Sequence, residues 1–364
     1  MTGLVTPGRL EAARRAMTGA GVDALLVSQP ENRRYLSGFT GSTAILLVAL
    51  ETAYIATDSR YWEQAEMECP GYELAQVRGQ VGPVVKELVA RCGAQRVGFE
   101  AQHATYADAE DWRNAAPDVE WVPTRDLVTT LRASKDGEEI AVLRRAVAMA
   151  DAAIADALAR MRPDMKEREV AWMIESYFRT HGAEGPSFET IVACGPNGAR
   201  PHARAGDAPI VPGQPIVIDM GAKLDGYCSD LTRTVCLGEP DEPERFWSVY
   251  NTVLRAQLAA EVAVKPGVAE RDVDSIARDI ITAAGYGENF GHGLGHGVGL
   301  AIHEYPRLSQ LADGTLKAGH VVTVEPGIYL TGWGGIRIED IALVTETGVE
   351  ILTQAPKDPI LRLL

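Results

Sequence analysis

Alternating glycines between Gly291 and Gly299 constrain the fold of this chain more than any other segment. The stretch reads GHGLGHGVG, and glycine at every second position makes a regular helix costly. An extended ribbon would instead let the backbone approach a ligand closely. The same region carries His292, His296 and His303. Because histidine is the commonest metal ligand and titrates near neutrality, we expect a metal site or an acid–base catalyst here.

The overall composition is that of an ordinary globular protein. The chain has 364 residues, 46% hydrophobic and 23% charged, which is enough for a sizeable core and predicts two domains. The longest apolar run, residues 44–50, is too short to span a bilayer, and the N-terminus carries no secretory signal. We therefore expect a cytoplasmic protein with no membrane partner.

Charge and cysteine content exclude further classes of protein. The net charge of −15 repels nucleic acid, so no nucleic-acid partner is expected. The five cysteines form no Cys-x-x-Cys pair, and their odd number argues against a disulfide framework. Cys228 could make the protein sensitive to thiol reagents, but a buried, inert thiol is the favoured interpretation.

The first part of the chain alternates between strand and helix patterns. Residues 8–20 and the segment VVKELVARCG are typical of amphipathic helices, whereas ALLVS, TAILLVAL, TAYIAT and RVGFE are typical of strands. This alternation predicts an α/β domain over residues 1–133. Asp136, followed three positions later by Glu139, resembles a capping box that opens a long helix, so we place the domain boundary near Ser134.

Residues 134–364 predict an α+β domain that contains two similar hairpins. Helices are expected over residues 138–161, 166–181, 242–263 and 269–284. In PIVIDMGAKLDGYCSDLTRTV, Asp219 lies on the first arm and Asp230 on the second. VVTVEPGIYLTGWGGIRIEDIALV repeats this layout with Glu325 and Glu339, which suggests an internal pseudo-repeat.

Four carboxylates on strand-like arms point to bound cations. A carboxylate inside a Val/Ile strand is costly unless it is paired or bound to a cation. Taken alone, Asp219 or Glu325 would more often be satisfied by an arginine or by backbone amides. Four carboxylates that oppose one another across two hairpins repel unless cations lie between them. With one strand histidine they could hold two divalent ions roughly 3.5–4 Å apart, an arrangement suited to hydrolysis.

Mostly oxygen ligands with one imidazole favour manganese or cobalt, with iron or zinc as alternatives.

Competing motifs are absent from the sequence. His303-Glu304 does not continue into a His-Glu-x-x-His zinc helix, and neither a phosphate-binding Gly-x-x-x-x-Gly-Lys loop nor a Gly-x-Ser-x-Gly elbow occurs.

These segments resemble a known family. VIDMGAKLDGYCSDLTRT, GHGLGHGVGLAIHE, TVEPGIY and GGIRIED are similar to the signature segments of the pita-bread metallopeptidases, the group of aminopeptidase P, prolidase and methionine aminopeptidase. NRRYLSGFTGS and TDSRYWEQA resemble the creatinase-like N-terminal domain of the Xaa-Pro peptidases. The resemblance implies a small creatinase-like domain followed by a pita-bread catalytic domain with pseudo-twofold symmetry.

The resemblance also implies roles for individual residues. The five metal ligands would be Asp219 on one metal, Asp230 and Glu339 as bridges, and His296 and Glu325 on the second metal. Glu325 would also move a proton to the leaving nitrogen. His202 would stabilise the oxyanion, while His292 and His303 would orient the substrate and steady the tetrahedral intermediate. For each of these three histidines, a structural role is the alternative.

Other residues have less specific interpretations. Arg337 is expected to orient Asp219, or else to be an ordinary strand arginine, and Tyr329 is either a wall of the site or part of the core. The remaining histidines, His103, His181 and His320, are expected to be structural.

The resemblance implies an Xaa-Pro peptidase that acts on proline-containing peptides, but it leaves the substrate length open. We favour an Xaa-Pro dipeptidase (prolidase), with aminopeptidase P as the alternative. A dipeptidase must recognise the proline carboxylate with a cation. Arg307 is the candidate, and its rivals are Arg33, Arg34 and Arg60. Methionine aminopeptidase activity and a non-catalytic binding role on the same scaffold are further alternatives. A homodimer is expected from the resemblance alone.

Overall fold

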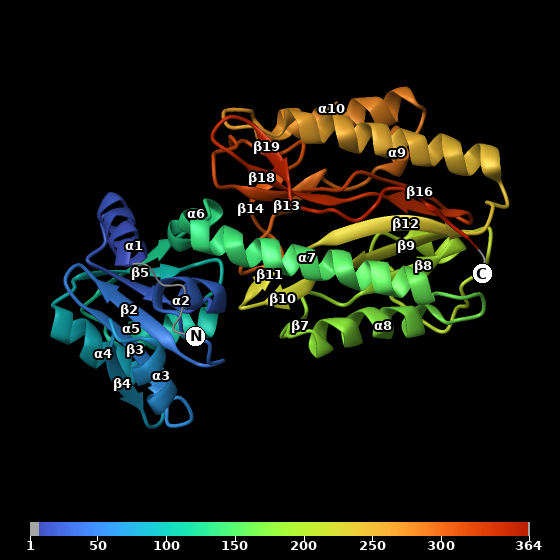
Figure 1. The fold of residues 1–364 in the computed structure, drawn as a ribbon. Coiled ribbons are helices and arrows are strands. Elements are labelled where there is room, and N and C mark those ends of the chain that lie inside the picture. Colours follow the sequence, from blue (N-terminus) through green and yellow to red (C-terminus); the bar gives the residue numbers. More distant parts are fainter. Residues whose placement is uncertain (1–6, 363–364) are drawn as a thin grey trace. The chain divides into compact units, whose positions relative to one another are not determined.

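The computed structural model describes residues 7–362, and the chain divides into two compact units between Arg132 and Ala133 (Figure 1). Both units combine helices with β-sheet, as the fold class expected from the sequence requires. Within the described residues, no helix has both the length and the apolar character needed to cross a membrane.

The first unit contains a six-stranded sheet in the order β4-β3-β2-β1-β5-β6. Strand β1 pairs antiparallel with β2, and β2 pairs antiparallel with β3, whereas the pairs β3–β4, β1–β5 and β5–β6 are parallel. The strands are β1 (Ala24–Val27), β2 (Ile45–Ala49), β3 (Ala53–Asp58), β4 (Glu73–Val77), β5 (Arg96–Glu100) and β6 (Glu120–Thr124). The helices are α1 (Pro7–Gly19), α2 (Pro30–Ser37), α3 (Trp62–Glu68), α4 (Val81–Cys92), α5 (Tyr106–Ala115) and α6 (Leu127–Ala133).

The four strands expected in this unit are confirmed as β1, β2, β3 and β5, and the two expected helices as α1 and α4. The sequence analysis missed both edge strands. Most residues of β4 and β6 are partly or fully exposed, and β6 contains Pro123. Edge strands of this kind lack the continuous apolar pattern of buried strands.

Four long helices organise the second unit, and each was predicted to within one residue at both ends. They are α7 (Gly137–Arg160), α8 (Glu167–Thr180), α9 (Pro243–Ala263) and α10 (Glu270–Ala283). The predicted capping box of α7 is confirmed: the Asp136 side chain accepts hydrogen bonds from the amides of Glu138 and Glu139, and the Glu139 side chain accepts from the Asp136 amide. This reciprocal arrangement satisfies amide groups that a helix start leaves unpaired.

The strands of the second unit form two main sheets and two small ones. The main sheets have the orders β20-β12-β9-β8 and β14-β13-β15-β18-β19; the small ones are β11-β10-β7 and β16-β17. The strands up to α9 are β7 (Gly185–Pro186), β8 (Ile191–Cys194), β9 (Pro215–Met220), β10 (Ala222–Leu224), β11 (Tyr227–Cys228) and β12 (Leu231–Leu237). Those after α10 are β13 (Gly295–Gly297), β14 (Glu304–Leu308), β15 (Val321–Val324), β16 (Gly327–Leu330), β17 (Gly334–Arg337), β18 (Asp340–Val344), β19 (Val349–Ile351) and β20 (Ile360–Leu361). Short 3-10 helices occur at Gly195–Ala199 and Gly287–Asn289.

Two apolar cores explain the repeated layout of this unit. Helices α7 and α8 pack against β8, β9 and β12, while α9 and α10 pack against β15, β17 and β18. Figure 1 shows the two main sheets of the unit between α9 and α10 on one side and α8 on the other. Each half therefore repeats two helices followed by antiparallel strands, which is the pseudo-symmetry expected from the hairpins.

Candidate metal centre

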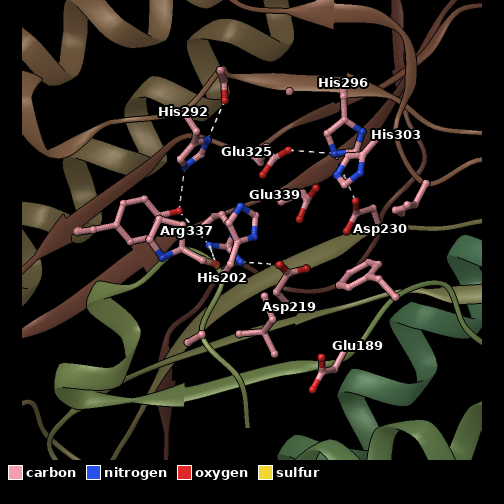
Figure 2. Close-up of a pocket in the computed structure, with 18 of the residues that line it drawn as sticks. Glu189, His202, Asp219, Asp230, His292, His296, His303, Glu325, Arg337 and Glu339 are labelled. Carbon is pink, nitrogen blue, oxygen red and sulfur yellow. Dashed lines mark hydrogen bonds and ion pairs between the residues drawn. The ribbon is translucent and has the colours of Figure 1, made fainter. Parts of the chain in front are cut away.

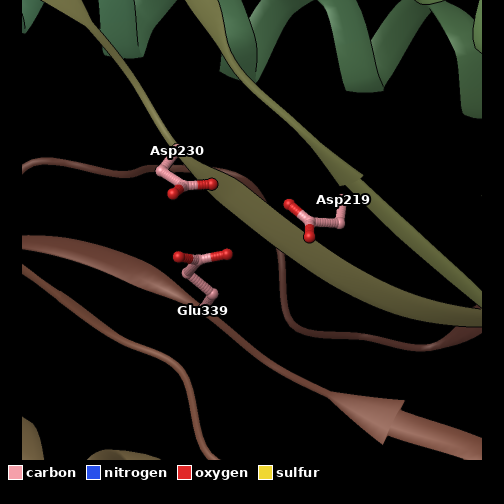
Figure 3. A group of neighbouring side chains, drawn as sticks. All are labelled: Asp219, Asp230 and Glu339. Carbon is pink, nitrogen blue, oxygen red and sulfur yellow. The ribbon is translucent and has the colours of Figure 1, made fainter. Parts of the chain in front are cut away.

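Three carboxylates from the two halves of the second unit converge in one buried place (Figure 3). Asp219 lies in β9, Asp230 immediately precedes β12, and Glu339 immediately precedes β18. One oxygen of each carboxylate lies within 4.8 Å of the others, and the three residues are at most 9% exposed. Three acidic side chains this close and this buried repel one another unless protons or cations lie between them.

Strand pairing brings these residues together. Because β9 and β12 are antiparallel, Thr232 lies opposite Asp219. The carbonyl of Thr232 accepts a hydrogen bond from the Glu339 amide at 3.1 Å, and its hydroxyl donates to Oε2 of Glu339 at 2.6 Å. Thr232 thus joins the first hairpin to the residue immediately before β18, which carries the third carboxylate.

The hydrogen bonding of the cluster is incomplete in a way that fits a cation site. Among the described residues, Oδ1 of Asp219 and Oε1 of Glu339 are buried oxygens without a hydrogen-bond partner. Burial, and secondly the neighbouring carboxylates, raise the pKa of Asp230 and of Glu339 well above the usual range. Buried carboxylate oxygens that lack a hydrogen-bond partner are suitable ligands for hard divalent cations.

His296 and Glu325 lie beside this trio. His296 Nε2 is 3.3 Å from Glu325 Oε1 and 3.6 Å from Asp230 Oδ2. Burial alone would raise the pKa of Glu325, but the hydrogen bond and the charge of His296 bring it down to about 2. His296 Nδ1 lies 3.1 Å from the Gly297 carbonyl. Because a carbonyl only accepts, Nδ1 carries the hydrogen, and Nε2 is the nitrogen that faces the carboxylates.

Arg337 balances part of the negative charge. Its Nη2 donates to Asp219 Oδ2 at 2.5 Å, its Nη1 to the Tyr329 hydroxyl at 2.9 Å and its Nε to the Thr232 hydroxyl at 3.1 Å. Burial opposes its charge, but Tyr329 and Asp219 outweigh burial and raise the pKa of Arg337 further above its usual value. Arg337 therefore stays charged and fixes one oxygen of Asp219, which leaves the other oxygen free for a cation.

The histidines lie around the carboxylates (Figure 2). His292 Nε2 is 2.9 Å from the Tyr329 hydroxyl, and its Nδ1 is 2.8 Å from the Gly293 carbonyl. The ring of His303 lies 4.3 Å from that of His296. Burial is the main cause that lowers the pKa of His292 and of His303, so both rings are neutral near pH 7 and able to accept or donate one hydrogen bond at each nitrogen.

All residues that the sequence analysis proposed for the site line one cavity of about 640 Å³. They are His202, Asp219, Asp230, His292, His296, His303, Arg307, Glu325, Tyr329, Arg337 and Glu339. Arg307 is exposed and lies opposite His296 in the β13–β14 pair. Its guanidinium meets no carboxylate at ion-pair distance in the described part of the chain, so it is free to meet an anionic group of a ligand.

The residues considered as rivals have other surroundings. Arg33 donates to the carbonyls of Ala44 and Ser42, and Arg60 pairs with Asp58 at 2.8 Å. Arg34 lies in α2. His181 stacks on a tyrosine ring, and His320 is buried.

The sequence analysis missed several residues of the site. The cavity wall includes Phe188, Glu189 and Ile191 around β8, and Ile302 near His303. The sequence analysis also missed Thr232. Thr232 lies two positions after Asp230, and strand alternation places both side chains on the same face, so this two-residue spacing was the available signal.

Comparison with known proteins gives consistent matches along the chain. The model of metallopeptidase family M24 matches residues 141–346, and that of the creatinase/prolidase N-terminal domain matches residues 9–134. An Xaa-Pro dipeptidase from Pyrococcus furiosus is 38% identical and covers 96% of this chain and 99% of its own length.

Two solved structures are also similar. The Xaa-Pro dipeptidase from Bacillus anthracis is 42% identical, with a TM-score of 0.94 over 98% of this chain and 99% of its own. The X-Pro aminopeptidase from Thermotoga maritima is 38% identical, with a TM-score of 0.87 over 96% of this chain and 100% of its own.

Proposed function

Because the chain belongs to metallopeptidase family M24, we propose that it is an Xaa-Pro peptidase, a hydrolase that cleaves the bond between an N-terminal residue and proline. The observation that carries this proposal is the buried trio Asp219, Asp230 and Glu339, with unpartnered oxygens, inside a cavity that also holds neutral histidines. Such a site suits hydrolysis of a peptide bond more than simple binding, because it combines cation ligands with hydrogen-bond donors.

We assign two divalent ions to this site. The residues that would hold them are Asp219, Asp230, His296, Glu325 and Glu339. Manganese is the first choice for a mostly oxygen donor set with one imidazole, with cobalt, zinc and iron as alternatives. When bound, such ions provide a nucleophile from water at neutral pH and withdraw charge from the substrate carbonyl.

The side chains of the cavity supply the proton transfers and the orientation. Glu325 accepts a proton from the attacking water and passes it to the departing imide nitrogen of proline. His202 donates to the oxygen of the scissile carbonyl as negative charge develops there. His292 and His303 hold the peptide in line for attack. Each of these residues lines the cavity.

We propose a dipeptide as the preferred substrate. Arg307 is exposed at the cavity and can bind the carboxylate that follows proline in a dipeptide. The second candidate is an Xaa-Pro aminopeptidase that acts on longer peptides, which the similarity to the Thermotoga maritima enzyme favours. The match to the creatinase/prolidase N-terminal domain speaks against a methionine aminopeptidase, since those enzymes normally lack such a domain. The homodimer remains a prediction, tested by the molecular mass in solution.

One assay tests the proposed function and the substrate length together. The protein is stripped of metal with a chelator, resupplied with manganese, and given Ala-Pro and Ala-Pro-Ala. We expect no cleavage without metal and much faster cleavage of Ala-Pro with it. Equal rates on both peptides would favour the aminopeptidase. A protein that binds no divalent metal and cleaves neither peptide would instead be a binding protein on this scaffold.

A further inference from the structure

A buried ion pair on α10 contacts the segment that carries His292. Asp274 and Arg278 face each other one helical turn apart, with Arg278 Nε 2.8 Å from Asp274 Oδ2 and Nη2 2.9 Å from Oδ1. The Asp274 side chain is fully buried and that of Arg278 is 16% exposed. A buried pair of this kind is weak grounds for stability, because desolvation offsets the attraction. Its other contacts suggest a different role.

The pair binds three main-chain groups of the irregular segment at residues 290–294, which leads into β13. Arg278 Nη1 donates to the Phe290 carbonyl at 3.0 Å and Nη2 donates to the His292 carbonyl at 2.8 Å. Asp274 Oδ1 accepts from the Leu294 amide at 3.0 Å. The guanidinium also lies over the Phe290 ring, 4.3 Å from its centre, a favourable position for a cation.

This segment needs an external support. His292 lies between Gly291 and Gly293, and glycines leave the backbone free to adopt many conformations. The Leu294 carbonyl in turn accepts from the Glu325 amide at 2.8 Å. The ion pair thus acts at two places in the cavity, on the backbone that bears the His292 ring and, through Leu294, on the backbone of Glu325.

We propose that Asp274 and Arg278 are positioning residues that hold His292, and through Leu294 also Glu325, in the geometry required for peptide hydrolysis. The planar guanidinium is suited to this task because it reaches one carboxylate and two carbonyls in fixed directions. A lysine ammonium cannot make these contacts together. This inference rests on the proposed function for its kinetic consequences, but the position of the His292 ring can be measured without any activity.

The first test is histidine-ring NMR on the metal-free protein. The chain has seven histidines, and the His292 signal is identified by its loss in His292→Gln. In Arg278→Met, we expect the His292 ring signals to shift or broaden while those of His103 and His181 stay in place. The matched control is Arg271→Met, which removes an exposed arginine from the same helix. Unchanged His292 signals in Arg278→Met would overturn the proposal.

The second test is a double-mutant cycle on Ala-Pro cleavage. Arg278→Met in the natural chain should lower kcat by about tenfold or more and change KM by less than about threefold. In the His292→Gln background, the same substitution should lower kcat by a clearly smaller factor than in the natural chain, because only its effect through Leu294 on Glu325 remains. An equal loss in both backgrounds would show a merely structural effect.

Arg278→Lys and Asp274→Asn keep the experiment decisive if Arg278→Met does not fold. Both retain a polar group of similar size and should give the same His292 signal changes and the same coupling. If the natural chain cleaves no Xaa-Pro peptide, the proposed function fails, while the NMR comparison still decides whether the ion pair positions His292.

Discussion

The hydroxyl of Thr232 donates a 2.6 Å hydrogen bond to Oε2 of Glu339, although the two residues belong to different halves of the second unit. Thr232→Val keeps the shape of the side chain and removes this bond. The buried carboxylate then loses a donor that orients it. We expect the affinity for manganese to fall about 10–100-fold, as measured by titration of the metal-free protein. Thr252→Val, which removes a hydroxyl bonded within α9, is the control and should bind manganese as before; equal affinity in both variants would contradict the assigned role.

Glu325 is expected to be the proton carrier. Glu325→Gln keeps the size of the side chain but cannot accept a proton, so kcat on Ala-Pro should fall by about two to four orders of magnitude. The manganese content should be measured in the same preparation, because Glu325 is also a proposed ligand. Glu189→Gln changes an exposed carboxylate of the same cavity and should stay within about threefold of the natural chain. A Glu325→Gln variant with more than a tenth of the natural activity would rule out this role.

Arg307 is expected to determine the preference for dipeptides. In Arg307→Met, the loss of a charge-assisted contact to the proline carboxylate should raise KM for Ala-Pro by about 10–100-fold. Cleavage of Ala-Pro amide, which lacks that carboxylate, should be the same in the variant and the natural chain. Arg204→Met removes another exposed arginine of the cavity and serves as the control. A parallel loss on both substrates would argue against a carboxylate clamp.

His320 should make stability depend on pH. Burial, and then Lys135 and Lys317, lower the pKa of His320 to about 4, and its Nδ1 accepts from the Lys317 amide. The unfolded chain binds this proton near pH 6.5. The stabilising contribution is therefore complete above pH 6.5 and is lost as the pH falls towards 4, by at most about 3 kcal/mol.

The measurement for His320 is denaturant unfolding at pH 7.5 and pH 5. His320→Gln should show a smaller difference between the two conditions than the natural chain. His181→Gln is the control, since His181 is exposed and stacks on Tyr177, and it should leave the difference unchanged. An unchanged difference in His320→Gln would contradict the prediction.

The sequence predicted the central elements of the fold because their patterns are local. Buried strands such as β2 and β9 are apolar runs in the sequence, and Asp136 and Glu139 predicted the start of α7. The edge strands β4 and β6 could not be predicted in this way. Each pairs with a neighbouring strand on one side only, so most of its residues are exposed. The sheet orders depend on pairings between distant segments, which local patterns do not encode.

The residues of the site likewise differ in whether a local pattern in the sequence predicts them. Asp219 and Glu325 stood out because a charge within or beside an apolar strand needs a reason. Asp274 and Arg278 gave no such signal, since an acidic and a basic residue four positions apart on a helix usually form a surface pair. Only the folded chain places them under the Gly291–Gly293 segment.

The three clustered carboxylates are divided between two stretches of polypeptide, with Asp219 and Asp230 before the loop at residues 238–242 and Glu339 after it. Cleaving the chain within that loop would yield two fragments, neither of which contains a full set of chelating groups. Manganese uptake would then report on whether the fragments have reassembled. The ion would serve as a readout of fragment complementation, independent of any peptide substrate.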